Sequence, residues 1–202
     1  MDPIPLPQSY HDFADKRTFL GIPNAMDVFS NIAIAIPAIY LLQKQNKFSL
    51  LSVHILVLSI ASTYYHLQPS DDRIFWDMMA VSTTHVVIAS FFIEKEYAIP
   101  LYIASILSVV YWKSTDDLRP YIVILVGIPI YLFLLLHKNK KITNYLYLII
   151  LFNSLARVTE HNDHSVYKLT GNQISGHTMK HIFGGIVSWL TILVLMKLNK
   201  IK

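Results

Sequence analysis

The sequence predicts an all-α protein of the polytopic membrane class, and three observations lead to this prediction. Hydrophobic residues make up 53% of the 202 residues and charged residues only 15%, whereas soluble domains carry about 25% charged residues. The apolar residues are gathered into long runs, and short polar segments separate these runs. Because the runs nearly fill the chain, we expect a single transmembrane domain over residues 1–202.

The sequence predicts seven transmembrane helices, since a bilayer core requires about 20 apolar residues per helix. Charged links such as residues 44–47 and 94–96 mark where the spans end. Residues 1–24 form a polar N-terminal segment without the apolar stretch of a cleaved signal peptide, so the first span is expected to direct insertion. The expected helices are residues 25–43, 49–67, 73–93, 97–113, 118–137, 142–158 and 173–197.

Composition also limits the partners and the location of the chain. The absence of Cys excludes disulfides and thiolate metal ligands. The formal net charge of +4 is modest and dispersed, so we do not expect a nucleic-acid partner. The basic cluster at residues 137–141 is typical of a cytoplasmic anchor. A small excess of Lys and Arg on the C-terminal side of the seven spans favours a cytoplasmic C-terminus and an external N-terminus.

Ionisable side chains within spanning helices are costly and by default mark functional sites. His66 ends the second expected span, Asp77 lies about one turn into the third, and His177 and His181 lie in the first two turns of the last. Even-numbered spans end on the side where odd-numbered spans begin, so all of these residues are expected at a similar depth. The short link at residues 67–72 also makes the second and third spans antiparallel neighbours.

The spacing of these residues predicts a metal site. His177 and His181 are four residues apart and share one helical face, as two ligands of one metal must, and Ser62 precedes His66 by the same interval. Three His ligands with an open fourth position are typical of catalytic zinc. Each feature has a plainer explanation: a chance His pair, a packing Ser62, or an Asp77 favoured near a helix start. The joint pattern is harder to explain structurally, because uncompensated His and Asp at that depth are costly.

The remaining histidines form weaker patterns. His54 and His85 occur singly within apolar runs, and we expect them to be buried, hydrogen-bonded residues. The polar stretch at residues 160–164 resembles a second metal cluster, but it lacks helical spacing and is expected to be mainly a solvated loop.

The motifs at these positions resemble those of the CREST superfamily of membrane hydrolases and receptors. The strings that carry the resemblance are Ser62-Thr63-Tyr64-Tyr65-His66, Phe75-Trp76-Asp77 and Ser175-Gly176-His177-Thr178-Met179-Lys180-His181. They are most similar to the bacterial alkaline-ceramidase-like branch, the alkaline phytoceramidase family, and the resemblance spans the whole chain. It implies that His66, His177 and His181 hold zinc. It further implies that Asp77 orients or deprotonates the attacking water, and that Ser62 steadies the metal site or the developing oxyanion.

By this resemblance the protein is expected to hydrolyse a lipid amide, with ceramide giving a sphingoid base and a fatty acid. The implied partners are a membrane lipid substrate and the lipid bilayer, and the implied location is a bacterial inner membrane. Two alternatives remain open at this point. One is a seven-helix receptor or sensor of the PAQR type with a structural zinc, and the other is a lipid ester hydrolase with the same site. The oligomeric state is also open.

One segment departs from the family pattern. The resemblance implies that eukaryotic alkaline ceramidases are activated by calcium through an acidic segment before the first helix. Residues Asp12 to Arg17 resemble that segment. Arg17 stands where a neutral ligand is expected, and Asn24 stands where the family has an acid. Because calcium requires about six to eight oxygen ligands, we expect Arg17 to replace calcium in holding this segment. The alternative is that these are solvated loop charges.

Overall fold

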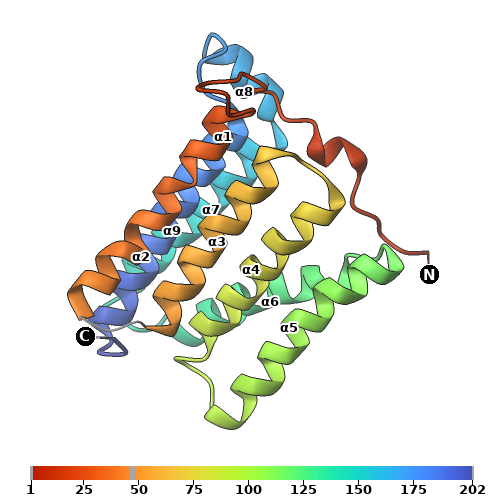
Figure 1. Ribbon diagram of the computed structural model, residues 1–202. Coiled ribbons are helices and arrows are strands. Elements are labelled where there is room, and N and C mark those ends of the chain that lie inside the picture. Colours follow the sequence, from red (N-terminus) through yellow and green to blue (C-terminus); the bar gives the residue numbers. More distant parts are fainter. Residues whose placement is uncertain (1, 46–48, 202) are drawn as a thin grey trace.

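The computed structural model describes residues 2–45 and 49–201, and this part of the chain is helical without a β-strand. Long helices run side by side, while the N-terminal segment and one short helix lie together at one end of the bundle (Figure 1). The helices are α1 (Ala25–Ser30), α2 (Ile32–Gln45), α3 (Leu50–Leu67), α4 (Asp71–Ala89), α5 (Lys95–Thr115), α6 (Arg119–Leu136), α7 (Thr143–His161), α8 (Asp163–Leu169) and α9 (Gly176–Lys197), preceded by a 3-10 turn, η1 (Gln8–His11).

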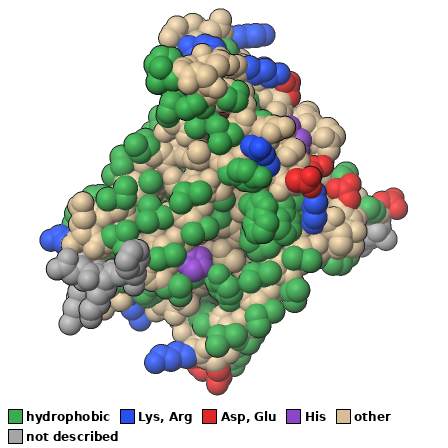
Figure 2. Space-filling view, in the orientation of Figure 1, with side chains coloured by type: hydrophobic (Ala, Val, Ile, Leu, Met, Phe, Trp, Pro, Cys, Tyr) green, Lys and Arg blue, Asp and Glu red, His purple; other side chains and the backbone are tan. Residues whose placement is uncertain are grey.

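Within the described residues, four helical segments are long and apolar enough to cross a membrane. They are Ala25–Lys44, which joins α1 and α2, and Leu50–Leu67, Arg119–Leu136 and Gly176–Lys197. Apolar side chains cover the middle of the face in Figure 2, and charged side chains gather towards its ends, as in a membrane protein. The predictions of an all-α fold and of helices suited to a membrane are therefore confirmed. The three other expected spans are also helical, as α4, α5 and α7, but the number of spans stays a prediction.

The observed helix starts follow capping side chains that the hydropathy pattern did not reveal. α4 begins at Asp71 because the Ser70 side chain accepts a hydrogen bond from the Arg73 backbone nitrogen. α9 likewise begins at Gly176, three residues later than expected, where the Ser175 side chain accepts from the Thr178 nitrogen. These caps fix where the first turns of both helices lie.

α9 occupies a central place in the bundle, packing against α1, α2, α7 and α8. α3 packs on α2 and α4, and α4 in turn packs on α5 and α6. The crossing of α9 with α2 depends on Gly185, where a Cβ atom would lie 2.3 Å from the carbonyl oxygen of Ala33. A small residue at this point permits close helix packing, as is common in membrane bundles.

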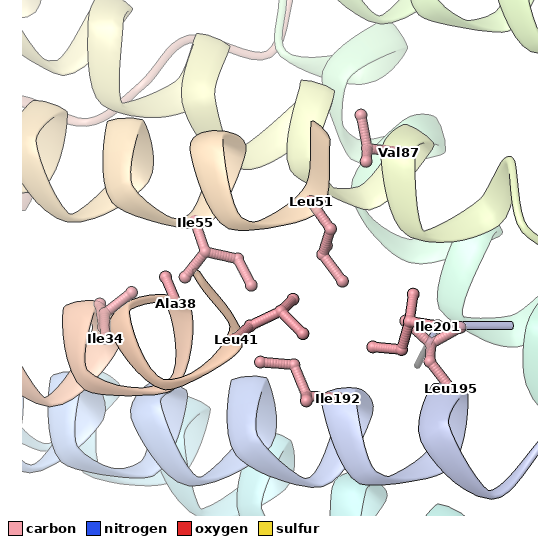
Figure 3. Close-up of a cluster of buried hydrophobic side chains, with 9 residues drawn as sticks. All are labelled: Ile34, Ala38, Leu41, Leu51, Ile55, Val87, Ile192, Leu195 and Ile201. Atoms are coloured by element: carbon pink, nitrogen blue, oxygen red, sulfur yellow. The ribbon is translucent and has the colours of Figure 1, made fainter. Parts of the chain in front are cut away.

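A cluster of buried aliphatic side chains, which we call the distal apolar cluster, lies at the end of the bundle away from α8. In Figure 3, the side chain of Ile201 and side chains from α2, α3, α4 and α9 point towards one another. The members are Ile34, Ala38, Leu41, Leu51, Ile55, Val87, Ile192, Leu195 and Ile201.

The N-terminal segment, residues 2–24, crosses the opposite end of the bundle (Figure 1). The Leu118 backbone nitrogen donates to the Ile4 carbonyl at 2.9 Å. Further along, His11 Nε2 lies 2.9 Å from Asp71 Oδ1, and the Ala14 nitrogen donates to Asp163 Oδ2 at 2.8 Å. The segment therefore covers the end where α3 stops and α4 and α9 begin.

Candidate metal centre

The three histidines predicted as ligands meet in the structure. His66, in the last turn of α3, and His177 and His181, in the first two turns of α9, are all buried. One ring nitrogen from each lies within 4.8 Å of the other two. His66 lies far from the other two residues in the sequence, so the fold creates the cluster by bringing the end of α3 close to the start of α9. We call these residues the His triad.

The spacing of one nitrogen pair in the His triad matches that of two ligands on a tetrahedral metal ion. His66 Nε2 and His177 Nε2 lie 3.3 Å apart. Two nitrogens that each bind one zinc ion at about 2.0–2.1 Å with tetrahedral angles are separated by about 3.3 Å. Two unprotonated ring nitrogens this close repel each other unless a proton or a metal ion lies between them. Three buried imidazoles therefore form a donor set compatible with zinc.

A serine that the sequence analysis missed orients His181. The Ser30 hydroxyl donates its single hydrogen to the Asp27 carbonyl at 3.1 Å and lies 2.7 Å from His181 Nδ1. With its hydrogen directed at the Asp27 carbonyl, the hydroxyl accepts from His181 Nδ1, and this tautomer leaves the lone pair of Nε2 for a metal. Such outer partners fix the tautomer of metal-binding histidines.

The start of α9 is tied to its neighbours by buried polar contacts. Asp163 of α8 accepts from the His177 backbone nitrogen at 2.8 Å, and Asp27 Oδ1 accepts from the hydroxyl of Thr178 at 2.6 Å. Gly176 permits the close approach, because a Cβ atom there would lie 2.0 Å from the Thr159 carbonyl oxygen. These contacts fix the depth and rotation of the helix that carries two members of the triad.

Phe13 covers the His triad from the N-terminal segment. Its buried ring lies 4.8 Å from the His66 ring and 4.5 Å from the His177 ring, measured between centroids. A second anchor of this region is the Asn24 side-chain amide, which donates to the His66 carbonyl at 2.9 Å. The polar N-terminal segment thus shields the triad from water, a role that its composition does not reveal.

Asp77 and Ser62 line one apolar cavity together with His181. The cavity has a volume of about 290 Å³ and lies between α3, α4, α6, α7 and α9. Asp77 Oδ1 is buried and, among the described residues, has no hydrogen-bond partner. Most of the cavity wall is aliphatic, including Leu58, Ile74 and Leu125. We call this space the apolar cavity. The Asp77 oxygen without a partner is available to accept a hydrogen bond from a polar reactant.

A second, more polar cavity of about 780 Å³ lies on another side of the triad and includes His177 in its wall. Residues of η1, the end of α7 and the start of α8 surround it. We call it the polar cavity. Tyr10 and Arg157 line both cavities. The triad therefore stands between an apolar and a polar compartment.

The stretch at residues 160–164 is helical and not the loop that we expected from the sequence, although His161, Asn162 and His164 are exposed to solvent, as expected. Glu160 lies in the last turn of α7, and its carboxylate accepts from Tyr10, Arg157 and Lys180. Asp163 begins α8 and is buried. Only Asn162 separates α7 from α8. The carboxylates of Glu160 and Asp163 accept hydrogen bonds from neighbouring donors.

The two single histidines are hydrogen-bonded, as expected, but half-buried. His54 Nδ1 bonds the Leu50 carbonyl and its Nε2 bonds the Tyr102 hydroxyl at 2.9 Å. His85 Nδ1 bonds the Val81 carbonyl at 2.8 Å. Neither belongs to the triad.

Arg17 pairs with Asp15 in the segment that resembles a calcium site. The guanidinium makes hydrogen bonds of 2.6 and 2.8 Å to the fully buried Asp15 carboxylate, and it donates to the Gln173 carbonyl at 2.7 Å. Burial opposes ionisation of Asp15, but the hydrogen bonds and charge of Arg17 outweigh it and hold the pKa of this carboxyl below its ordinary value. Arg17 thus joins the N-terminal segment to the loop before α9.

Lys180 and Arg157 are functional candidates that the sequence analysis did not single out. Both are ionisable residues inside expected spans, so the rule that identified the triad would have found them. Ser30 and Phe13 offered no comparable signal, because a hydroxyl or an aromatic residue is common in such segments.

In comparisons with known proteins, no protein-family model matches the chain, and no curated protein matches its sequence.

Proposed function

We propose that this protein is a zinc-dependent intramembrane hydrolase that cleaves a lipid amide in the manner of a ceramidase. The observation that carries the proposal is the His triad beside a cavity that also contains the Asp77 carboxylate. A structural zinc site is normally closed by a fourth protein ligand. Among the described residues, the metal-binding group contains only the three histidines.

The proposed zinc ligands are His66, His177 and His181, and Ser30 would hold His181 in the required tautomer. Zinc in such a site supplies Lewis acidity, which lowers the pKa of water and polarises a carbonyl group. Asp77 is the proposed general base, which accepts a proton at its buried Oδ1 and passes it to the leaving nitrogen. Ser62 is proposed to donate its hydroxyl hydrogen to the oxyanion that develops on the substrate carbonyl.

The walls of the apolar cavity support a lipid substrate. Aliphatic side chains from several helices form most of the wall, as is usual for sites that hold a hydrocarbon chain. We further propose that all seven long helical segments cross the bilayer, because the four apolar segments and the remaining long helices pack in one bundle. A substrate dissolved in the membrane can then reach a site under one membrane face.

The proposal is tested by incubating purified protein with ceramide and measuring the released sphingoid base and fatty acid by mass spectrometry. We expect release by the native protein, and no release by His177→Ala or by protein stripped of metal. Untargeted lipid analysis of cells with and without the protein tests the choice of substrate.

The same experiment separates the alternatives. Release of fatty acid from an ester lipid but not from ceramide would identify an esterase. Tightly bound zinc without turnover of any lipid would contradict a hydrolase and favour a receptor or sensor.

A further inference from the structure

An ionic cluster of four side chains separates the two cavities. Glu160 stands at its centre: Tyr10 donates to Oε1 at 2.8 Å, Arg157 donates to Oε2 at 2.8 Å, and Lys180 also bonds Oε1. Tyr10 and Arg157 face both cavities, and Lys180 faces the apolar one. Because Lys180 precedes His181 directly and Arg157 lies on the adjacent helix α7 (Figure 1), the cluster lies beside the His triad.

The cluster carries more positive charge than its own carboxylate neutralises. It contains two cations and one anion. Glu160 and Lys180 are largely buried, with 12% and 23% of their side chains exposed. A single cation would be enough to pair Glu160 and join α7 to α9. The second cation, Arg157, is therefore not needed to neutralise Glu160.

Arg157 provides the donors that a ligand would use. Among the described residues, Glu160 is its hydrogen-bonding partner, and 58% of the side chain is exposed although it lines both cavities. A guanidinium has several N–H donors in a planar fork that matches the two oxygens of a carboxylate or phosphate. One of these donors is used by Glu160, which also fixes the orientation of the rest.

The surroundings define the remainder of the ligand. The apolar cavity extends from the cluster along aliphatic side chains such as Ile122 and Leu125. A ligand that satisfies both parts has a hydrocarbon chain and an anionic end. The guanidinium donors of Arg157 that Glu160 does not use match the oxygens of a released fatty acid or of a phosphate-bearing lipid, whereas the neutral head of ceramide has no such pair of charged oxygens.

We propose that Arg157 and Lys180 bind the oxyanion group, a carboxylate or a phosphate, of an amphiphile whose hydrocarbon chain lies in the apolar cavity. Glu160 and Tyr10 are positioning residues that hold the two cations. The inference rests on the proposed function only in treating the apolar cavity as the substrate cavity. Binding itself requires neither zinc nor turnover.

The test is displacement of a fluorescent fatty acid from the purified full chain in a nonionic detergent, as purified and again after metal chelation. The competitors are dodecanoate, dodecyl phosphate and the neutral dodecanol. We expect at least one anion to bind about tenfold or more tightly than the alcohol, the scale of one hydrogen bond to a charged group. Preference for dodecanoate identifies the product carboxylate, and preference for dodecyl phosphate identifies a phosphate head group.

The double variant R157Q/K180Q should lose this preference. R73Q/K113Q, which removes one Arg and one Lys that line neither cavity, should keep it. If R157Q/K180Q fails to fold because Glu160 is left unpaired, R157Q/E160Q/K180Q removes all three charges and is used instead. Equal binding of the anions and the alcohol, or an unchanged preference in the folded variant, would overturn the proposal. Ceramide hydrolysis is measured separately, so failure of anion binding and failure of the proposed function are distinguishable.

Discussion

The two ends of the α2–α3–α9 packing differ in what they bury. At one end the distal apolar cluster consists only of aliphatic side chains (Figure 3). At the other end the same helices α3 and α9 bury three imidazoles, and α1 adds the Asp27 carboxylate. His66 Nδ1, Asp77 Oδ1 and Asp27 Oδ2 at this end lack a hydrogen-bond partner among the described residues.

This difference indicates that the buried polar groups at the end with the His triad do more than hold the helices together. Aliphatic side chains hold the helices together at the distal end, and none of the cluster's own side chains has a polar atom to satisfy. Buried polar atoms without partners cost free energy, so their concentration at one end is best explained by a function there. Substitutions at the two ends should accordingly have different consequences.

The largest effect is expected from the His triad. His66→Ala, His177→Ala or His181→Ala leaves two imidazoles, which hold zinc poorly, so metal content and activity should fall together to near zero. Elemental analysis and ceramide turnover of the same preparations check this. Full zinc retention in any of the three variants would remove that residue from the ligand set.

Asp77→Asn should reduce turnover about a hundredfold or more, the range of lost general-base catalysis. The amide keeps the size of the side chain but cannot accept the proton of the attacking water. Zinc should remain, since Asp77 is not part of the metal-binding group. If Asp77→Asn loses zinc as fully as His66→Ala does, Asp77 is a ligand and the assigned role is wrong.

Ser62→Ala should have a milder effect, a loss in turnover of up to about tenfold, the value of one hydrogen bond. The zinc content should not change. A loss as large as that of Asp77→Asn would give Ser62 an essential part in the chemistry.

Arg17→Ala should act mainly on stability, by about 1–3 kcal/mol, because it removes the charged partner of the buried Asp15 carboxylate, which among the described residues keeps hydrogen bonds only from the backbone nitrogen of residue 17 and the Tyr167 hydroxyl. The pKa of Asp15 is lowered in the folded protein. The pairing therefore stabilises the fold above the unfolded Asp pKa of about 3.9, and this is lost as pH falls through the lower folded value. The difference in thermal stability between native protein and variant should shrink in acid.

Activity of the native protein should survive a calcium chelator too weak to remove zinc, and strong activation by calcium would contradict the role of Arg17.

The smallest effect on the site is expected at the distal end. Leu41→Ala removes a fully buried side chain and should destabilise the fold by about 2–5 kcal/mol. Zinc content and turnover of the folded fraction should stay unchanged. A loss of zinc comparable to that of the triad variants would show that the two ends are not independent.

The sequence predicted the parts of this structure that depend on hydropathy and helical spacing. Each expected span contains a helix, although the bounds differ, since α4 ends at Ala89 and α9 begins at Gly176. The spacing of His177 and His181 correctly placed them on one helical face. The sequence did not predict α8 or the covering role of Phe13. Both depend on tertiary contacts, such as the Asp163 bonds to Ala14 and His177. Spacing within one helix carries no information on such contacts.

The most direct test of the central claim is the metal content of the native protein, purified without exposure to chelator. The account predicts about one zinc ion per chain, as a site of three histidines with an open position requires. It also predicts that removing this zinc abolishes lipid hydrolysis and that restoring it returns the activity. Protein that is folded, free of zinc and unable to take it up would contradict the account.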